Sequence, residues 1–133
     1  MSVFVDTSFL VALLDEDDDR ASTAAALWRQ AAAARLPVFT TNYVVLETCV
    51  VLQRRFGLAA LRRLVRHILT PVHLEWVTSD DHEHAVEALL VADRPRLSLV
   101  DCTSFEVMRR LEANECLAFD QHFAEQGFTI VED

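Results

Sequence analysis

Residues 3–14 read Val-Phe-Val-Asp-Thr-Ser-Phe-Leu-Val-Ala-Leu-Leu, a short apolar run followed at once by a second one with helical character. We expect a buried strand over Val3–Val5 and a helix through Phe9–Leu14, with the acid Asp6 at the junction between them. A short strand that is apolar throughout is typical of a sheet covered on both faces by helices. A strand that leads directly into a helix is also the first half of a parallel βαβ unit.

The same alternation of strand and helix continues along the chain. Further strands are expected at Val38–Thr40, Leu74–Val77, Cys116–Phe119 and Thr129–Val131. Helices are expected over Arg20–Arg35, from an N-cap at Asn42 to the break at Gly57, over Leu58–Leu69, over Glu83–Val91 with a cap at Ser79 or Asp80, and from about Val100 to Ala113. This order predicts one α/β domain over residues 1–133, with a mainly parallel sheet of four to five short strands between two helical layers.

Four acids stand alone inside apolar stretches that contain no Lys or Arg: Asp6, Glu47, Asp101 and Asp120. Burying a carboxylate is costly unless it is paired, protonated or bound to a metal. Asp6 and Asp120 each follow a predicted strand, and ligands bind at the carboxyl ends of strands in such sheets. Asp101 opens a predicted helix and Glu47 lies early in another, so the four can meet. Converging carboxylates would form a hard-cation site, most naturally for Mg²⁺.

Each acid also has a simpler explanation. Asp6 could cap the helix that follows it, and Asp101 could be a first-turn acid favoured by the helix dipole. Asp120 could be an ordinary turn residue. Glu47 could be neutralised by an arginine from elsewhere in the chain, such as Arg54 or Arg109. The joint occurrence of all four acids is what favours the metal site.

Composition excludes several classes of function. The net charge is −9 and all twelve basic residues are arginines, which argues against a protein that holds nucleic acid by bulk electrostatics. A bound Mg²⁺ could still reverse the field that a phosphate meets. The chain has only two glycines, Gly57 and Gly127, and no lysine, so a P-loop and a Rossmann cofactor site are both excluded.

The chain shows no targeting or membrane feature. No apolar run approaches the roughly 20 residues that span a bilayer, and the start lacks a basic region, so a cytoplasmic location without membrane contact is expected. The three cysteines lie in apolar segments without metal-site spacing and are expected to be reduced.

Other polar clusters are weaker candidates. The run Asp15–Asp19 is expected to be a solvated loop. His82 and His84 are two residues apart on a predicted helix and do not share a face. A group of arginines is expected either to be a solvated surface or to contact RNA phosphates or an acidic partner. Its members are Arg54, Arg55, Arg62, Arg63 and Arg66, with Arg109 and Arg110 as similar candidates.

Four segments, in this order, resemble the motifs of the PIN domain, and in particular those of VapC-like toxin nucleases. They are Val5-Asp-Thr-Ser-Phe9, Thr40-Thr-Asn-Tyr-Val-Val-Leu-Glu47, Leu97-Ser-Leu-Val-Asp-Cys-Thr-Ser-Phe-Glu-Val-Met108 and Leu117-Ala-Phe-Asp-Gln-His-Phe-Ala-Glu-Gln-Gly-Phe128. The resemblance covers essentially the whole chain.

The resemblance implies a Mg²⁺-dependent endoribonuclease in which Mn²⁺ can substitute. Asp6 and Asp101 would be the main metal ligands, and Glu47 and Asp120 would complete the centre. Thr7, Asn42 and Ser104 would be neighbouring polar groups that orient a ligand or water. The family relationship further implies a homodimer that is inhibited by a small antitoxin protein.

Two other functions remain open from the residues alone, and a third is disfavoured. The chain could be a PIN-like binding or assembly module without activity, or a nuclease or phosphatase that acts on DNA or nucleotides. A phosphoacceptor receiver domain also has an acidic pocket, but receivers use a lysine and this chain has none.

Overall fold

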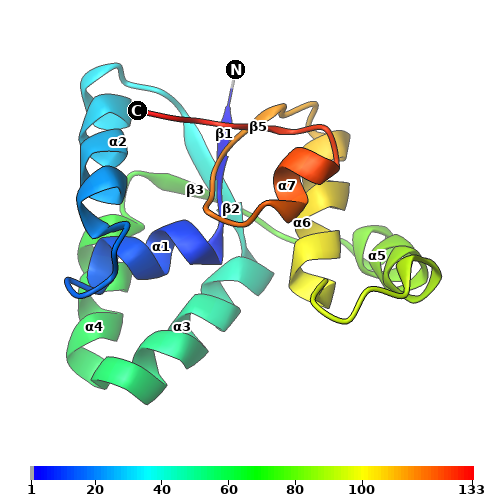
Figure 1. The fold of residues 1–133 in the computed structure, drawn as a ribbon, viewed down its shortest axis with the longest axis horizontal. Coiled ribbons are helices and arrows are strands. Elements are labelled where there is room, and N and C mark those ends of the chain that lie inside the picture. Colours follow the sequence, from blue (N-terminus) through cyan, green and yellow to red (C-terminus); the bar gives the residue numbers. More distant parts are fainter. Residues whose placement is uncertain (1) are drawn as a thin grey trace.

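The computed structural model describes residues 2–133 and contains one parallel sheet between two layers of helices (Figure 1). The sheet has five strands in the order β3-β2-β1-β4-β5. They are β1 (Val3–Val5), β2 (Val38–Thr41), β3 (Val72–Glu75), β4 (Glu115–Leu117) and β5 (Thr129–Ile130). All four strand pairs are parallel, which confirms the predicted fold class.

The helices divide between the two faces of this sheet. They are α1 (Thr7–Leu14), α2 (Ala21–Ala33), α3 (Asn42–Phe56), α4 (Leu58–Arg63), the π-helical turn η1 (Leu64–Ile68), α5 (Ser79–Ala92), α6 (Leu99–Arg110) and α7 (His122–Glu125). In Figure 1, α1 to α4 lie on one side of the strands and α6 and α7 on the other. Within residues 2–133, no helix combines the length and apolarity needed to cross a bilayer.

The order of the strands creates a crevice between β1 and β4. From β1 the chain moves outward through β2 to β3, and it then crosses to β4 on the opposite side of β1. Ligands in open α/β sheets bind at such a reversal, outside the carboxyl ends of the strands. The N–H of Asp6 donates to the carbonyl of Leu117 at 3.0 Å, which fixes the two strand ends side by side.

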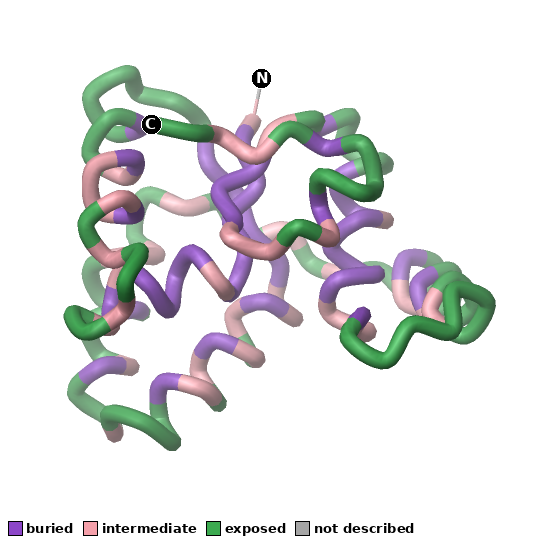
Figure 2. The backbone as a smooth tube through the Cα atoms, in the orientation of Figure 1, coloured by how far each residue is buried: buried purple, intermediate pink, exposed green. Residues whose placement is uncertain are grey.

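Aromatic side chains join the sheet to the helical layers. Phe4, at the centre of β1, has its ring 5.4 Å from that of Phe39 and 5.9 Å from that of Phe123. Phe105 of α6 packs against both Phe123 and Phe128. Figure 2 shows the two central strands β1 and β2 as continuously buried, whereas the edge strands β3 and β5 are intermediate or exposed. The core therefore lies directly behind the carboxyl ends of β1 and β4.

Two predicted helix caps are wrong by one residue or more. Asn42 is the first residue of α3 and not its cap, because the Thr41 hydroxyl accepts the N–H of Val44 at 3.1 Å. Helix α5 is capped by Thr78 in a reciprocal capping box with Asp81, and not by Ser79 or Asp80. Threonine and asparagine are both good caps, so propensity alone could not separate adjacent candidates.

Some element bounds also differ from prediction. Strand β3 begins two residues earlier, because Val72 pairs with Val38 and Glu75 with Thr41, so Trp76 and Val77 lie beyond the strand. The expected strand over Cys116–Phe119 is Glu115–Leu117. The expected helix over Leu58–Leu69 is divided into α4 and η1.

Candidate metal centre

Asp6 is held at the end of β1 by the residues that follow it. It is the N-cap of α1, and its Oδ2 accepts the backbone N–H of Ser8 at 3.1 Å and the Ser8 hydroxyl at 2.7 Å. The residue is only 3% exposed. The capping role that the sequence allowed is therefore real, and it fixes the carboxylate at the mouth of the crevice.

Asp101 is fixed in a similar way at the start of α6. It is the third residue of the helix, and it forms a reciprocal capping box with Ser98. Its Oδ2 accepts the Ser98 N–H at 3.1 Å, and its own N–H donates to the Ser98 hydroxyl at 3.0 Å. Because the capping box uses one carboxylate oxygen, the other is left for a ligand.

Asp120 follows β4 on the other side of the crevice. Its Oδ1 accepts the backbone N–H of His122 at 2.9 Å, which sets the direction of the carboxylate. Asp101, Asp120 and His122 each offer one ligand atom, and these three atoms lie within 4.8 Å of one another. Ligands on one shared ion, at about 2.1 Å each, lie at most about 4.2 Å apart, so a small closure would complete the site.

Glu47 lies on α3, where it is half-buried. The ion pairs among residues 2–133 include none that neutralises Glu47, so pairing with Arg54 or Arg109 is not observed. The pKa of Glu47 is raised, first by burial and then by the charges of Asp101 and Asp120, against a hydrogen bond from Thr7. The charge of Glu47 therefore interacts with those of Asp101 and Asp120.

The pKa values of three of the acids, Asp6, Glu47 and Asp101, are raised, as expected for buried carboxylates close to one another. Burial raises the pKa of Asp6 to about 7; the hydrogen bonds from Ser8 oppose this shift, and the charge of Asp101 adds to it. The pKa of Asp101 is also raised, first by burial and then by Asp120. A divalent cation would reverse these shifts, because it favours the ionised carboxylates. The residues present thus fit a hard divalent ion.

Three residues of the site were not singled out in the sequence: Ser8, Ser98 and His122. Ser8 belongs to the Asp-Thr-Ser segment, and Ser98-x-x-Asp101 is a capping-box pattern, so both had a recognisable signal. His122 had none, since it lies on α7 and comes near Asp101 of α6 only in the folded chain.

The three polar neighbours expected beside the acids have different roles. The Thr7 hydroxyl lies 3.4 Å from the carbonyl oxygen of Val44 and 3.3 Å from the Thr48 hydroxyl, and these contacts tie α1 to α3. Ser104 is fully buried, and its hydroxyl donates to the carbonyl of Val100 within α6. Thr7 adjoins the acids, whereas Ser104 supports the helix that carries Asp101.

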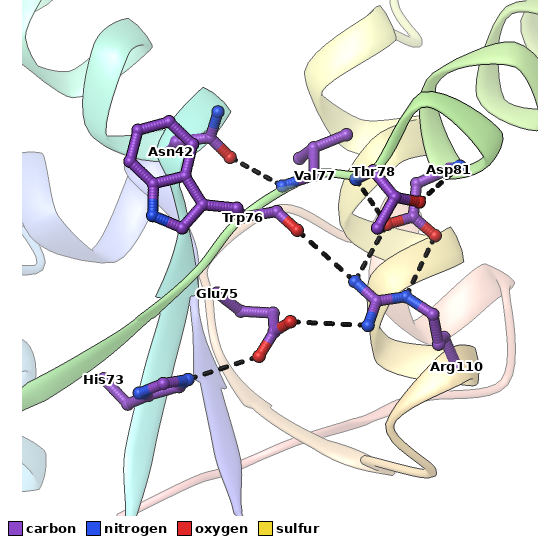
Figure 3. Close-up of polar contacts among 8 residues, drawn as sticks. All are labelled: Asn42, His73, Glu75, Trp76, Val77, Thr78, Asp81 and Arg110. Atoms are coloured by element: carbon purple, nitrogen blue, oxygen red, sulfur yellow. Dashed lines mark hydrogen bonds and ion pairs between the residues drawn. The ribbon is translucent and has the colours of Figure 1, made fainter.

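Asn42 belongs to a separate network around the end of β3 (Figure 3). Its Oδ1 accepts the N–H of Val77 at 2.7 Å. Arg110 donates to Asp81 at 2.9 and 3.1 Å, to Glu75 at 3.3 Å and to the carbonyl of Trp76 at 3.4 Å. The side chains of Asn42 and Arg110 thus hold the two sides of the peptide group that joins Trp76 to Val77, and Arg110 is not a free cation.

The remaining candidate arginines lie on the surface away from the crevice. Arg55 pairs with Asp15 at 3.8 Å, and Arg109 lies over the ring of Phe128 while donating to Gln126. The other four, all exposed, are Arg54, Arg62, Arg63 and Arg66. In Figure 1 the end of α3 and α4, which carry most of these residues, lie far from the start of α3.

The profile of the PIN domain matches residues 3–128 of this chain. A parallel sheet with acids at the β1–β4 crevice fits a metal-dependent α/β nuclease, and the match to the family profile identifies the family. The chain belongs to the PIN domain family, a nuclease fold whose enzymes use divalent metal ions.

Within the family, the chain is similar to the 23S rRNA-specific endonuclease VapC20 of Mycobacterium tuberculosis, in two strains of that organism. The two sequences are 42% identical over 131 residues, which is 97% of each chain. The crystal structure of that VapC20, described as a sarcin-ricin loop cleaving toxin, superimposes with a TM-score of 0.86 at 41% identity, and covers 98% of this chain and 99% of its own.

More distant structures share the fold. VapBC2 from Rickettsia felis, bound to a DNA fragment from its promoter, has a TM-score of 0.74 at 10% identity and covers 98% of both chains. FitAcB from Neisseria gonorrhoeae has a TM-score of 0.69 at 11% identity, over 99% of this chain and 97% of its own. At these identities the likeness concerns the fold alone.

Proposed function

We propose that this chain is a single-domain, metal-dependent endoribonuclease that cleaves RNA phosphodiester bonds at the β1–β4 crevice, as the toxin of a toxin–antitoxin pair. The observation that carries the proposal is the cluster of ligand atoms from Asp101, Asp120 and His122. The charge of Asp101 also raises the pKa values of Asp6 and Glu47, which supports their inclusion in the same centre. Similarity to the VapC20 endonuclease over 97% of both chains supports it.

The four acids would hold Mg²⁺, for which Mn²⁺ can substitute. Asp6 and Asp101 are the principal ligands, because both are buried and both are oriented by hydrogen bonds from a serine. Glu47 and Asp120, which are more exposed, complete the centre and face the substrate. When bound, the metal activates water and stabilises charge on the phosphate. The chain's own carboxylates would hold the ion at the crevice, in the orientation that the serine hydrogen bonds set.

The substrate class is structured RNA with an accessible loop. The similar VapC20 is named for 23S rRNA and for the sarcin-ricin loop, and we extend that target to this chain as a proposal. The target would place the protein in the cytoplasm with the ribosome. A loop rather than a duplex is favoured because unstacked bases are accessible to protein side chains.

Trp76 is the side chain best placed to receive such a base. It is 66% exposed, although its backbone is held by Asn42 and Arg110 (Figure 3). Glu75 pairs with Thr41 at the carboxyl edge of the sheet, so Trp76 projects from the same edge as Asp6, two strand spacings or about 10 Å away. Stacking provides affinity that a chain of net charge −9 cannot obtain from bulk electrostatics.

The partners we propose are a small antitoxin and a second copy of the chain. The exposed arginines of α3 and α4 suit an acidic antitoxin segment, and the exposed apolar side chains of α3, Leu46 and Val50, suit a dimer contact. Growth arrest on expression, relieved by the co-expressed partner, would support the toxin role. Unhindered growth would count against it.

The deciding experiment compares wild type with Asp101→Asn on a pool of structured RNAs that includes a ribosomal loop, with Mg²⁺, with Mn²⁺ and with EDTA. We expect discrete, metal-dependent cleavage by the wild type only, with the variant still folded by circular dichroism. Equal cleavage by both proteins would refute the assignment of the site.

Two rival functions have their own outcomes in the same experiment. A matched DNA pool tests the metal-dependent DNA nuclease, which requires DNA cleavage at a rate comparable to that of RNA. Titration with Mn²⁺ tests the inert PIN-like module, which requires absence of metal binding. The retention of all four acids favours the enzyme over the module.

A further inference from the structure

We propose that His122 is a nitrogen ligand of this metal centre, with Nε2 toward the ion and Nδ1 backed by the Glu125–Arg94 ion pair. The inference rests on the proposed metal-dependent function and extends it, because it concerns which ion the centre prefers. It comes from a histidine that the acidic motifs do not include.

The first observation is a buried nitrogen without a partner. His122 is the first residue of α7, and its side chain is only 14% exposed. Its Nδ1 is fully buried and, among the described residues, has no hydrogen-bond partner. Buried polar atoms are nearly always paired. The unpaired Nδ1 therefore shows that no hydrogen bond of the described residues holds the ring through this atom.

The second observation is the spacing on the Nε2 side of the ring. His122 Nε2 lies 3.9 Å from Asp120 Oδ1, too far for a hydrogen bond. Two ligands on a common divalent ion lie roughly 3–4 Å apart, given ligand distances of about 2.1 Å. With Asp101, these groups form the cluster whose ligand atoms fall within 4.8 Å of one another. The separation fits a shared ion better than a direct contact.

The third observation is the carboxylate on the far side of the ring. His122 Nδ1 lies 3.9 Å from Glu125 Oε2, and that oxygen accepts a 2.6 Å hydrogen bond from Arg94. Metal-bound histidines usually donate their second N–H to a carboxylate, which fixes the tautomer and the ring orientation. Glu125 is in position for this role after a small movement of the ring.

A protonated His122 that merely neutralises the acids is the main alternative. An imidazolium would be expected to donate short hydrogen bonds to its carboxylates, yet both nitrogens stand 3.9 Å from their nearest acid oxygens. A ring that binds an ion through Nε2 does not need direct contact with either carboxylate, in agreement with the two 3.9 Å distances. The two roles differ in whether nitrogen bonds the metal.

A nitrogen ligand changes the choice of ion. Mg²⁺ prefers oxygen ligands, whereas imidazole suits the transition metals. We therefore expect the centre to bind Mn²⁺ more tightly than Mg²⁺. Replacement of His122 should lower Mn²⁺ affinity by about tenfold or more and affect Mg²⁺ affinity much less, because the oxygen ligands stay.

The test is pulsed electron paramagnetic resonance on the wild-type protein loaded with Mn²⁺. We expect ¹⁴N coupling to the bound ion in the wild type, its loss in His122→Gln, and its retention in the control His82→Gln. His82, on α5, is a suitable control because its Nδ1 is hydrogen-bonded to the hydroxyl of Tyr43 at 2.7 Å.

The outcomes separate this inference from the proposed function. Bound Mn²⁺ without nitrogen coupling in the wild type, together with RNA cleavage, would overturn the role of His122 and leave the nuclease intact. Coupling that persists in His122→Gln would also overturn it. Absence of Mn²⁺ binding would overturn both. The wild-type spectrum decides the question even if His122→Gln fails to fold.

Discussion

The hydroxyl of Ser8 joins Asp6 to the strand end that precedes Asp120. It donates to Asp6 Oδ2 at 2.7 Å and accepts the backbone N–H of Phe119 at 2.9 Å. A serine hydroxyl has one donor and two acceptor sites, so a single group can serve both partners. The acids after β1 and β4 are thereby held at a fixed separation before any ion binds.

Ser8→Ala is expected to lower metal affinity about tenfold or more, the usual effect of losing a group that orients a ligand. The variant leaves the Phe119 N–H without its acceptor, and it removes a hydrogen bond that lowers the pKa of Asp6. Isothermal titration with Mn²⁺ measures the effect. Ser104→Ala is the matched control, because its hydroxyl bonds only within α6. Equal losses in both variants would contradict the bridging role.

The metal-free protein should lose stability as the pH rises from about 4 to about 7. The pKa of Asp6 is about 7 when folded against 3.8 for an unperturbed side chain, so the folded state holds a proton that the unfolded chain releases in this range. The shift corresponds to at most about 4 kcal/mol. The pKa values of Asp101 and Glu47 are also raised in the folded state, so these residues contribute in the same direction. The pKa of Asp81 is lowered, so its contribution to the pH dependence of stability lies at a pH below this range.

Urea unfolding in EDTA at pH 5 and pH 8 measures this dependence. Added Mg²⁺ should recover stability mainly at pH 8, because the metal competes with protons for the same carboxylates. Greater stability at pH 8 than at pH 5 in EDTA would contradict the buried, unpaired state of Asp6.

Asp101→Asn should stabilise the metal-free protein at pH 8 even though it abolishes cleavage. The amide removes a charge that raises the pKa values of Asp6 and Glu47, and it can still accept the Ser98 N–H. A gain of about 1 kcal/mol would raise Tm by roughly 3–6 °C. Thermal unfolding in EDTA measures it, with Asp80→Asn, an exposed first-turn acid of α5, as the control. A lower Tm would mean that the carboxylate is needed for folding.

Arg110→Ala should destabilise the fold by about 1–3 kcal/mol, through the loss of its hydrogen bonds to charged groups. Asp81 is 5% exposed and would keep its charge with only the Thr78 N–H as a donor. Urea unfolding measures the change, and the exposed Arg62→Ala should differ little from wild type. A stable Arg110→Ala with weakened RNA binding would instead assign the residue to the RNA surface.

The fold and the position of Asp6 and Asp120 at the carboxyl edge of the sheet could be predicted from the sequence, because both depend on local pattern. An apolar strand directly followed by Asp6 places the acid at the carboxyl edge of any parallel sheet, whatever the exact bounds of the strand. Asp120 follows by the same reasoning from β4. The end of a strand, not its length, was the informative quantity.

The contacts of Arg110 and the position of His122 near Asp101 could not be predicted, because they depend on partners that are distant in the sequence. Arg110 meets Asp81 across 29 residues, and His122, on α7, meets Asp101, on α6, only in the folded chain. The predicted cap of α3, Asn42, lies one residue after the observed cap, Thr41, because both residue types are good helix caps. Its true partner, Val77, lies 35 residues away.

Trp76→Ala should weaken RNA binding about tenfold or more, since stacking on an aromatic ring contributes about 1–3 kcal/mol per base. The chain has two tryptophans, so Trp28→Phe leaves Trp76 as the only indole. In an Asp101→Asn background, which should bind RNA without cleaving it, we expect a loop RNA to quench the remaining fluorescence. Trp76→Phe should retain most of the affinity, because a smaller ring can still stack. Unchanged RNA affinity in Trp76→Ala, together with a loss of dimer in sedimentation, would assign the exposed indole to a protein contact.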